Sequence, residues 1–550
     1  MDGPPGEGAA GTLAQRRAAG MTGASGRARL LAPLRQLNRR TAPPLLIYLA
    51  AGASGFATIA ETFWVREQLG LGPTALLALA AWLTVPWTLK MVFGQLVDTV
   101  PLLGSRRRAY ILLGALLQAT ASLALAAAAA GRTGPVTADA VYVAASLLAV
   151  IGLVVQDCVA DALTTEVVDR TGPDGAPRDP AVVQAELGDV QVLGRVAVMG
   201  GAFAVAGIGG WAAQVLPAAT VFLIGAAVPL LSMLAALLLR EAGDEPPLRP
   251  DWRILGGGAV FGAALLALGL GDPPYAPEIA LLLSLGVLVL LVRRTMAGIP
   301  PATRRAMAAA AALIFAYRAA PPTGPALQWW QIDVLGYTEG FFGVLAQIGT
   351  GLAIVGSLLL GGRIVRLPLA TVLAWLAVLG AVLALPTIGM LFGLHHWTEA
   401  HLGFGARTIG LVDTALSAPL AQLGMIPVLT LIAVHAPEGR QATWFALVAS
   451  LMNLALQAGS VFSRGLNAVF PVERGDYASL PALVIAATLA GLVLALGAIA
   501  LLGPWVRPAA AEPRPSATDN RPARKREPAR GNAAAPTEAG EAAADARPEP

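Results

Sequence analysis

The chain has 550 residues, of which 56% are hydrophobic and only 13% are charged, with a formal net charge of +4. Apolar runs of about 20 residues, long enough to cross a hydrocarbon layer roughly 30 Å thick, recur along the sequence. This composition excludes an ordinary soluble protein of several domains, and the lack of period-2 alternation argues against an outer-membrane barrel. The positive charge comes largely from loops and tails, so we expect contact with the lipid bilayer and no nucleic-acid binding.

The two ends of the chain are predicted to be disordered cytosolic tails. Residues 1–40 are rich in Gly, Ala and Arg and have no apolar core, so no cleavable signal peptide is predicted. Residues 508–550 are rich in Ala, Pro, Arg and Glu, a composition typical of disorder. The single Cys158 excludes an intramolecular disulfide and a Cys-cluster metal site.

Between the tails the apolar runs predict about 14 transmembrane helices. The N-terminal half, 41–240, is expected to hold six, at roughly 44–66, 73–98, 107–131, 138–167, 185–214 and 217–240. A linker, 241–302, begins with the polar stretch EAGDEPPLRPDW and is expected to hold two extra helices, near 254–271 and 277–292. The C-terminal half, 303–507, is expected to hold six more, at roughly 303–328, 338–362, 368–393, 406–435, 440–466 and 479–505.

The distribution of arginine predicts the orientation of these helices. With the N-terminus in the cytosol, the cytosolic loops receive Arg106, Arg107, Arg108, Arg240, Arg249, Arg253, Arg293, Arg294, Arg304, Arg305, Arg363 and Arg366. The opposite loops are poor in Lys and Arg, as the positive-inside rule requires. An even number of spans then keeps both termini cytoplasmic, and we expect a multi-pass protein of the inner membrane.

An internal repeat predicts the fold class. FWVREQLGLGPTALLALA (63–80) aligns without gaps to WWQIDVLGYTEGFFGVLA (329–346), matching Trp64 with Trp330 and Glu67 with Asp333. We therefore expect an all-α polytopic membrane protein of the major facilitator fold, with two parallel six-helix halves and two extra helices between them. Such transporters place the substrate near the midplane between the halves.

A lysine lies inside the predicted second span, in TVPWTLKMVFGQLVD (84–98). Lys90 is eight residues before Asp98, which places it about 12 Å inside the membrane boundary. Asp157 and Asp161 in the fourth span share one helix face and lie at estimated depths of about 18 and 12 Å. The matching depths predict an ion pair between Lys90 and Asp161 or between Lys90 and Asp157.

One lysine against two aspartates leaves an excess carboxylate. Two neighbouring carboxylates favour proton uptake by one of them, which predicts proton coupling during transport. A static buried salt bridge, with the second aspartate hydrogen-bonded or facing the cytosol, explains the same residues equally well.

Two arginines and one tryptophan complete the candidate binding residues. A guanidinium matches a carboxylate, so Arg195 in the fifth span and Arg318 in 303–328 can hold an anionic substrate group. An ion pair with Asp189 or with an acid of the fourth span is an alternative role for Arg195. Arg318 precedes Pro321 and Pro322, which are expected to break the helix beside it. Trp87, three residues from Lys90, is the aromatic residue most expected to face a cavity.

No nucleophile–base set, phosphate-binding glycine loop or metal-ligand cluster stands out, so we expect neither an enzyme nor a cofactor. GQLVDTVPLLGSRRR resembles the major facilitator signature between the second and third helices. Gly94, Asp98, Arg106 and Arg107 are therefore predicted to form a cytoplasmic latch that stabilises one transport state. The alternative is that these boundary charges serve topology only.

A family resemblance is carried by VPWTLKMVFGQLVDTVPLLGSRRRAYILLG. It resembles the signature of the folate–biopterin transporter family, with matching residues at Pro86, Trp87, Lys90, Gly94, Asp98, Pro101, Gly104, Arg106, Arg107 and Tyr110. QDCVADALTTEVV, with Asp157, Asp161 and Glu166, is similar to the family's fourth-helix pattern, and the resemblance covers most of residues 44–505. Two departures are RRRAY in place of a basic-Pro-Tyr ending and the extra helix pair, which is typical of muropeptide permeases.

The resemblance implies a secondary active transporter for pterins, folates or related small organic solutes. With the charged residues described above, we expect proton symport of an anionic solute, and we expect a monomer. Two alternatives stay open. One is a muropeptide-permease-like transporter of another solute. The other is a non-transporting membrane assembly factor, similar to the related proteins of bacteriochlorophyll delivery.

Overall fold

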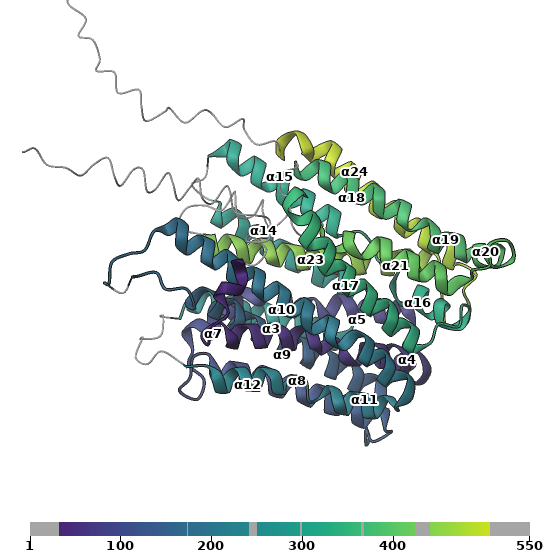
Figure 1. The fold of residues 1–550 in the computed structure, drawn as a ribbon, viewed down its shortest axis with the longest axis horizontal. Helices are drawn as coiled ribbons and strands as arrows, with labels where there is room; N and C mark the ends of the chain where they lie inside the picture. The colour runs from purple at the N-terminus through teal and green to yellow at the C-terminus, as the bar shows by residue number, and fades with distance from the viewer. Residues whose placement is uncertain are drawn as a thin grey trace, which may run out of the picture. The chain divides into compact units, whose positions relative to one another are not determined.

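The computed structural model describes residues 32–172, 174–240, 250–296, 300–364, 368–423 and 441–506. Within these ranges the chain is helical and contains isolated β-bridges but no strand (Figure 1). The predicted tail 508–550, most of the predicted tail 1–40 and the later part of the predicted span 406–435 lie outside the described residues.

The first twelve elements belong to the predicted N-terminal half. They are η1 (Ala32–Gln36), α3 (Ala42–Ala53), η2 (Ser54–Ala57), α4 (Thr58–Gln68), α5 (Pro73–Leu83), α6 (Val85–Thr88), α7 (Lys90–Thr99), α8 (Arg108–Ala129), α9 (Ala138–Glu166), α10 (Pro180–Val215), α11 (Ala218–Gly225) and α12 (Leu230–Leu238). Several predicted spans therefore consist of two or three consecutive helices.

The remaining helices comprise the extra pair and the C-terminal part of the chain. They are α13 (Trp252–Gly271), α14 (Ala276–Thr295), α15 (Pro301–Arg318), α16 (Gly324–Asp333), α17 (Glu339–Ile364), α18 (Leu369–Leu383), α19 (Leu385–Leu391), α20 (Leu394–Leu402), α21 (Ala406–Leu423), α23 (Gln441–Val469) and α24 (Leu480–Val506). Helices α4 and α16, which the repeat aligns, are each followed by a short turn and another helix, α5 and α17.

Eleven stretches of the described residues are long and apolar enough to cross a membrane. They include both extra helices but none of the predicted spans 303–328, 406–435 and 440–466. The first of these is divided between α15 and α16, and the eighteen residues of α15 include three arginines. Helices α21 and α23 border residues 424–440, which are not described. The count of 14 spans therefore stays a prediction.

Prolines explain two of the breaks, and both breaks lie beside predicted site residues. Pro86 lacks the amide hydrogen that a continuous helix would use, and the backbone becomes regular again only after Leu89. Lys90 is consequently the first residue of α7. Helix α15 ends at Arg318, directly before the segment that contains Pro321 and Pro322, which confirms the predicted break.

The helix contacts show which elements lie side by side. In the N-terminal part α3 packs on α9, α10 and α12, and α8 packs on α9. Their shared core contains buried side chains from α3, α7, α8, α9 and α12. In the C-terminal part α15 packs on α23 and α24. Contacts of α10 with α17 and of α5 with α23 join the two parts, while α13 lies on α7 and α14 on α23.

Five glycines of α10 lie within eleven residues, and four of them, Gly201, Gly207, Gly209 and Gly210, lie where a neighbouring segment approaches closely. A Cβ atom at Gly210 would collide with Gly343 of α17, and one at Gly201 would collide with α3. Glycine is therefore required where α10 meets these two neighbours. Gly200 is the exception, because it has open space around the position of a Cβ atom.

Two ends of the helix bundle are named here by their residues. The Gly70 end contains the turns between α4 and α5 and between α16 and α17. The Asp98 end contains the end of α7, the start of α8 and the end of α9. Figure 1 shows the Gly70 end on the right, near the labels α4, α16 and α20.

Candidate functional site

The centre of the candidate site is a three-residue ion cluster between α7 and α9. The Lys90 ammonium forms an ion pair with Asp157 and a second one with Asp161, at 2.6 Å between Nζ and Oδ2. The depth estimate predicted one of these two pairs, and the structure contains both. The Lys90 and Asp157 side chains are 22% and 20% exposed, whereas that of Asp161 is 47% exposed. The two carboxylates therefore share one cation in different surroundings.

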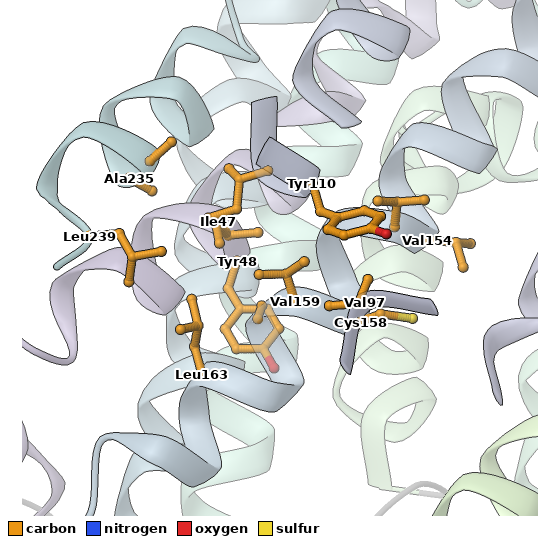
Figure 2. Close-up of a cluster of buried hydrophobic side chains, with 14 residues drawn as sticks. Ile47, Tyr48, Val97, Tyr110, Val154, Cys158, Val159, Leu163, Ala235 and Leu239 are labelled. Atoms are coloured by element: carbon orange, nitrogen blue, oxygen red, sulfur yellow. The ribbon is translucent and has the colours of Figure 1, made fainter. Parts of the chain in front are cut away.

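Tyr48 of α3 extends the cluster to a third helix. Its hydroxyl donates a hydrogen bond of 2.6 Å to Oδ1 of Asp161, and its ring belongs to the buried core of the N-terminal part. Cys158 lies in the same core (Figure 2). Its thiol donates to the Lys90 carbonyl at 3.5 Å. Apolar packing thus fixes one side of the ion cluster. Tyr48 was not predicted as a site residue, because the sequence around a tyrosine in an apolar run does not show which group its hydroxyl will bind.

Arg195 brings a second positive charge to the cluster from α10. Its guanidinium interacts electrostatically with Asp157 and with Tyr48. One turn earlier, Gln191 donates a hydrogen bond of 3.0 Å to the Thr164 hydroxyl of α9, which orients this face of α10. Arg195 thus interacts with an acid of the fourth span at longer range, but among the described residues it forms neither of the two predicted ion pairs, with Asp189 or with a fourth-span acid.

The other predicted binding residues lie apart from one another. Trp87, on α6, is partly buried and packs against the N-terminal core. Arg318 ends α15, in the C-terminal part of the chain. Beside it, the Pro322 carbonyl accepts a hydrogen bond of 2.6 Å from the Ser463 hydroxyl of α23. The helix break therefore exposes a backbone group, as predicted, but α23 already satisfies that group.

A cavity of about 350 Å³ lies among α15, α16, α18, α19, α21 and α24. The Asp413 carboxylate is on its wall and accepts a hydrogen bond of 3.3 Å from Thr387. Leucines and a valine line most of the remaining wall, together with the hydroxyls of Tyr317, Ser417 and Thr488. Mostly apolar walls with a few polar groups are typical of small-molecule sites.

The predicted latch residues meet at the Asp98 end. Arg107 pairs with Asp98 at 2.8 Å and with Glu166 of α9 at 2.6 Å. Burial opposes the charge of Arg107, but its bonds to Glu166 and Asp98 together raise the pKa of the guanidinium. Arg106 donates to the Asp98 carbonyl at 3.4 Å. Gly94 has open space around the position of a Cβ atom, so its contacts in this conformation do not require glycine.

A second charge cluster, at the Gly70 end, was not predicted. Arg66 of α4 pairs with Asp333 of α16, and the Tyr477 hydroxyl donates to the same carboxylate. Nearby, Asn467 of α23 donates to the Thr74 hydroxyl of α5 at 2.6 Å. We call these residues the Gly70-end closure, because the Arg66–Asp333 and Asn467–Thr74 bonds join the N-terminal part of the chain to the C-terminal part, while Tyr477 supports Asp333 from within the C-terminal part. The repeat aligned Glu67 with Asp333 but gave no sign that Arg66 would be the partner.

Solved structures with similar folds define the class of protein. The chain resembles a crystal structure of a POT family transporter in complex with a thioalcohol-conjugated peptide, with a TM-score of 0.61 at 14% identity over 85% of this chain and 96% of that one. A peptide transporter POT in complex with sulfate gives a TM-score of 0.57 at 18% identity, over 84% and 94% of the two chains. These likenesses confirm the predicted fold, a helical membrane-protein fold of the major facilitator type.

The family follows from the sequence comparison. The BT1 family matches residues 51–509, and the chain belongs to this family. A protein described as a folate-biopterin transporter from Synechocystis sp. (strain ATCC 27184 / PCC 6803 / Kazusa) is 28% identical over 82% of this chain and 79% of its own. The family and this relative are transporters, which confirms that the chain is not an enzyme.

Proposed function

We propose that the protein is a proton-coupled secondary transporter that moves a pterin-like or folate-like organic anion by alternating access. It acts as a monomer in the inner membrane, with both termini in the cytoplasm. The observation that carries the proposal is the cluster of Lys90 with Asp157 and Asp161, two of whose members are about four-fifths buried.

The charge balance of this cluster supports proton coupling. One ammonium neutralises one carboxylate, so the ion-paired trio of Lys90, Asp157 and Asp161 itself carries a net negative charge, in a region where isolated charges are costly. Proton binding removes that charge, and proton release restores it when the surroundings change. A compact ammonium can change partners between Asp157 and Asp161 as one of them is protonated, which a planar guanidinium does less readily.

The same cluster offers a place for an anionic substrate group. Arg195 adds a second cation beside Asp157, so protonation of an aspartate would leave the positive charges in excess. A carboxylate or an ionised ring oxygen of the solute would then be attracted. The name of the Synechocystis relative supports a pterin or folate as this solute.

Uptake by the purified protein in proteoliposomes tests the proposal, with an imposed pH gradient and labelled folic acid, biopterin, a muropeptide and an amphipathic acid as probes. We expect saturable uptake of folic acid or biopterin that collapses when a protonophore removes the gradient. Asp157→Asn and Asp161→Asn are compared with Asp174→Asn, a control in an exposed loop. If both cluster variants keep gradient-driven uptake, neither aspartate is the coupling site.

The other outcomes separate the remaining candidates. Uptake of the muropeptide alone would indicate a muropeptide-permease-like transporter. A folded protein that takes up none of the probes would instead favour the membrane assembly role.

A further inference from the structure

Glu61 of α4 is an intramembrane carboxylate outside the Lys90 cluster. It lies seven residues before Gln68, the last residue of α4, and therefore about 10 Å from the Gly70 end. It is deep within the N-terminal part of the chain yet remains partly accessible. A charged carboxylate in such a place is costly unless a cation pairs with it.

The surroundings of Glu61 contain one titratable partner. The Tyr142 hydroxyl of α9 donates a hydrogen bond of 2.9 Å to Oε1 of Glu61. Helices α10, α11 and α17 also pack on α4, but among the described residues they bring no charged side chain into interaction with Glu61. Tyr142 shares a further hydrogen bond with Ser146, one turn along α9. Glu61 thus has a hydrogen-bond partner of fixed position and, within the part of the chain that the structure describes, no counter-ion.

The helix that carries Glu61 also carries the Gly70-end closure. Arg66, five residues further along α4, pairs with Asp333 of α16, and Phe63 between them packs edge-on against Phe342 of α17, with 6.0 Å between ring centroids. These contacts lie between Glu61 and the Gly70 end. Separation of α4 from α16 and α17 would therefore open a path from that end to Glu61.

We propose that Glu61 is a second proton-binding site of the transporter, which exchanges its proton with the Gly70 end when the closure opens. Tyr142 is its positioning residue. This inference rests on the proposed function, because it assigns Glu61 to the same coupled cycle. Glu61 would exchange protons with one side of the membrane, and the Lys90 cluster, near the Asp98 end, with the other.

The experiment has a readout that is independent of the substrate. Infrared spectroscopy of the purified wild-type protein at neutral pH should show the C=O stretch of a protonated carboxylic acid in an apolar environment. Glu61→Gln should remove this band. Glu67→Gln should keep it, because Glu67 lies on the same helix but its side chain is 52% exposed. Equal bands in all three proteins would overturn the proposal.

Transport assays test the coupling role separately. Glu61→Gln should lower gradient-driven accumulation of labelled folic acid by about 10-fold or more, while exchange of labelled for unlabelled folic acid without a gradient stays within about 2-fold. Retained exchange also shows that the variant is folded. Loss of the infrared band with unchanged gradient-driven accumulation would overturn the coupling role. Should the wild type itself fail to use the gradient, the proposed function fails, and the infrared band still decides whether Glu61 binds a proton.

Discussion

The Lys90 cluster and the Gly70-end closure both contain buried or partly buried charges. The first joins helices within one part of the chain, and the second joins the two parts. Lys90, Asp157 and Asp161 all belong to the N-terminal part of the chain, on α7 and α9. Arg66 and Asp333 belong to α4 and α16, on the two sides of the repeat. The first cluster can persist while the two parts of the chain move relative to each other. The second must break if α4 and α16 separate.

This difference assigns the two clusters separate roles in the proposed cycle. Charges within one part can bind protons and substrate throughout the cycle. Their removal therefore changes the stability of every conformation. A pair between the parts stabilises only the conformations in which the Gly70 end is closed. Substitutions in the Lys90 cluster should therefore change stability and coupling, whereas substitutions in the closure should change the populations of states.

The largest effect is expected from Lys90→Ala. It leaves two carboxylates of one buried cluster without their shared cation, and breaking such a pair typically costs about 3 kcal/mol. Thermal unfolding in detergent should show a clear loss of stability. The triple variant with Asp157→Asn and Asp161→Asn should recover most of it, because the uncompensated charges are then gone. Unchanged stability and transport in Lys90→Ala would refute both roles of this lysine.

A smaller effect, on conformation, is expected from Arg66→Gln. Loss of a partly buried pair worth about 1–2 kcal/mol should raise the population of open conformations about 10-fold. The measurement is labelling of Thr62→Cys by a membrane-impermeant maleimide in a Cys158→Ala background, since Thr62 is one turn from Arg66 on the same face of α4.

The charge-reversed pair Arg66→Asp with Asp333→Arg provides the control for this variant. It should return labelling toward the slow rate of the parent protein. Equal labelling rates in all of these proteins would contradict the idea that the closure stabilises one conformation. The proposed difference in role between the closure and the Lys90 cluster would then be wrong.

The sequence predicted the main features of the fold because they depend on hydrophobic length and periodicity. Runs of about 20 apolar residues indicate membrane-spanning helices whatever their neighbours are. The alignment of 63–80 with 329–346 predicted that the two halves are parallel repeats. The division of spans into α5, α6 and α7 or into α15 and α16 was only partly foreseen. The break at Pro321 and Pro322 was predicted, whereas the one beside Pro86 was not, because 73–98 was predicted as one continuous span.

The Lys90 cluster could be predicted because the depth of a residue in the membrane follows from its distance along the sequence to the end of its helix, at about 1.5 Å per residue. Sequence spacing does not supply lateral neighbours. Tyr48 was therefore missed, and Glu166 was named only as part of the family pattern, without its pairing to Arg107. Glu61 and Arg66 were missed for a related reason. Both belong to the first span, close enough to its end to be taken for boundary residues, and only packing shows that their partners come from α9 and α16.

A weaker effect is expected at the predicted latch, from Glu166→Gln. Arg107 keeps its bond to Asp98 in this variant, and the Glu166 side chain is about half exposed, so the loss should be near 1 kcal/mol or below. Arg107→Gln removes both bonds and should cost more. Unfolding midpoints and transport rates of the two variants check this order. A larger loss in Glu166→Gln than in Arg107→Gln would show that Glu166 has a stabilising interaction other than its ion pair with Arg107.

The smallest effect is expected where the extra helix pair meets the C-terminal part. Arg464 of α23 pairs with Glu278 of α14 through both carboxylate oxygens, at 2.6 and 2.9 Å, while α13 packs on α7 of the N-terminal part. The helix pair therefore contacts both parts, as the closure does, but through a pair whose side chains are 28% and 29% exposed. Glu278→Gln should cost well under about 1 kcal/mol and leave maleimide labelling of Thr62→Cys unchanged. If labelling instead rises as it does in Arg66→Gln, the extra helices also hold the two parts together.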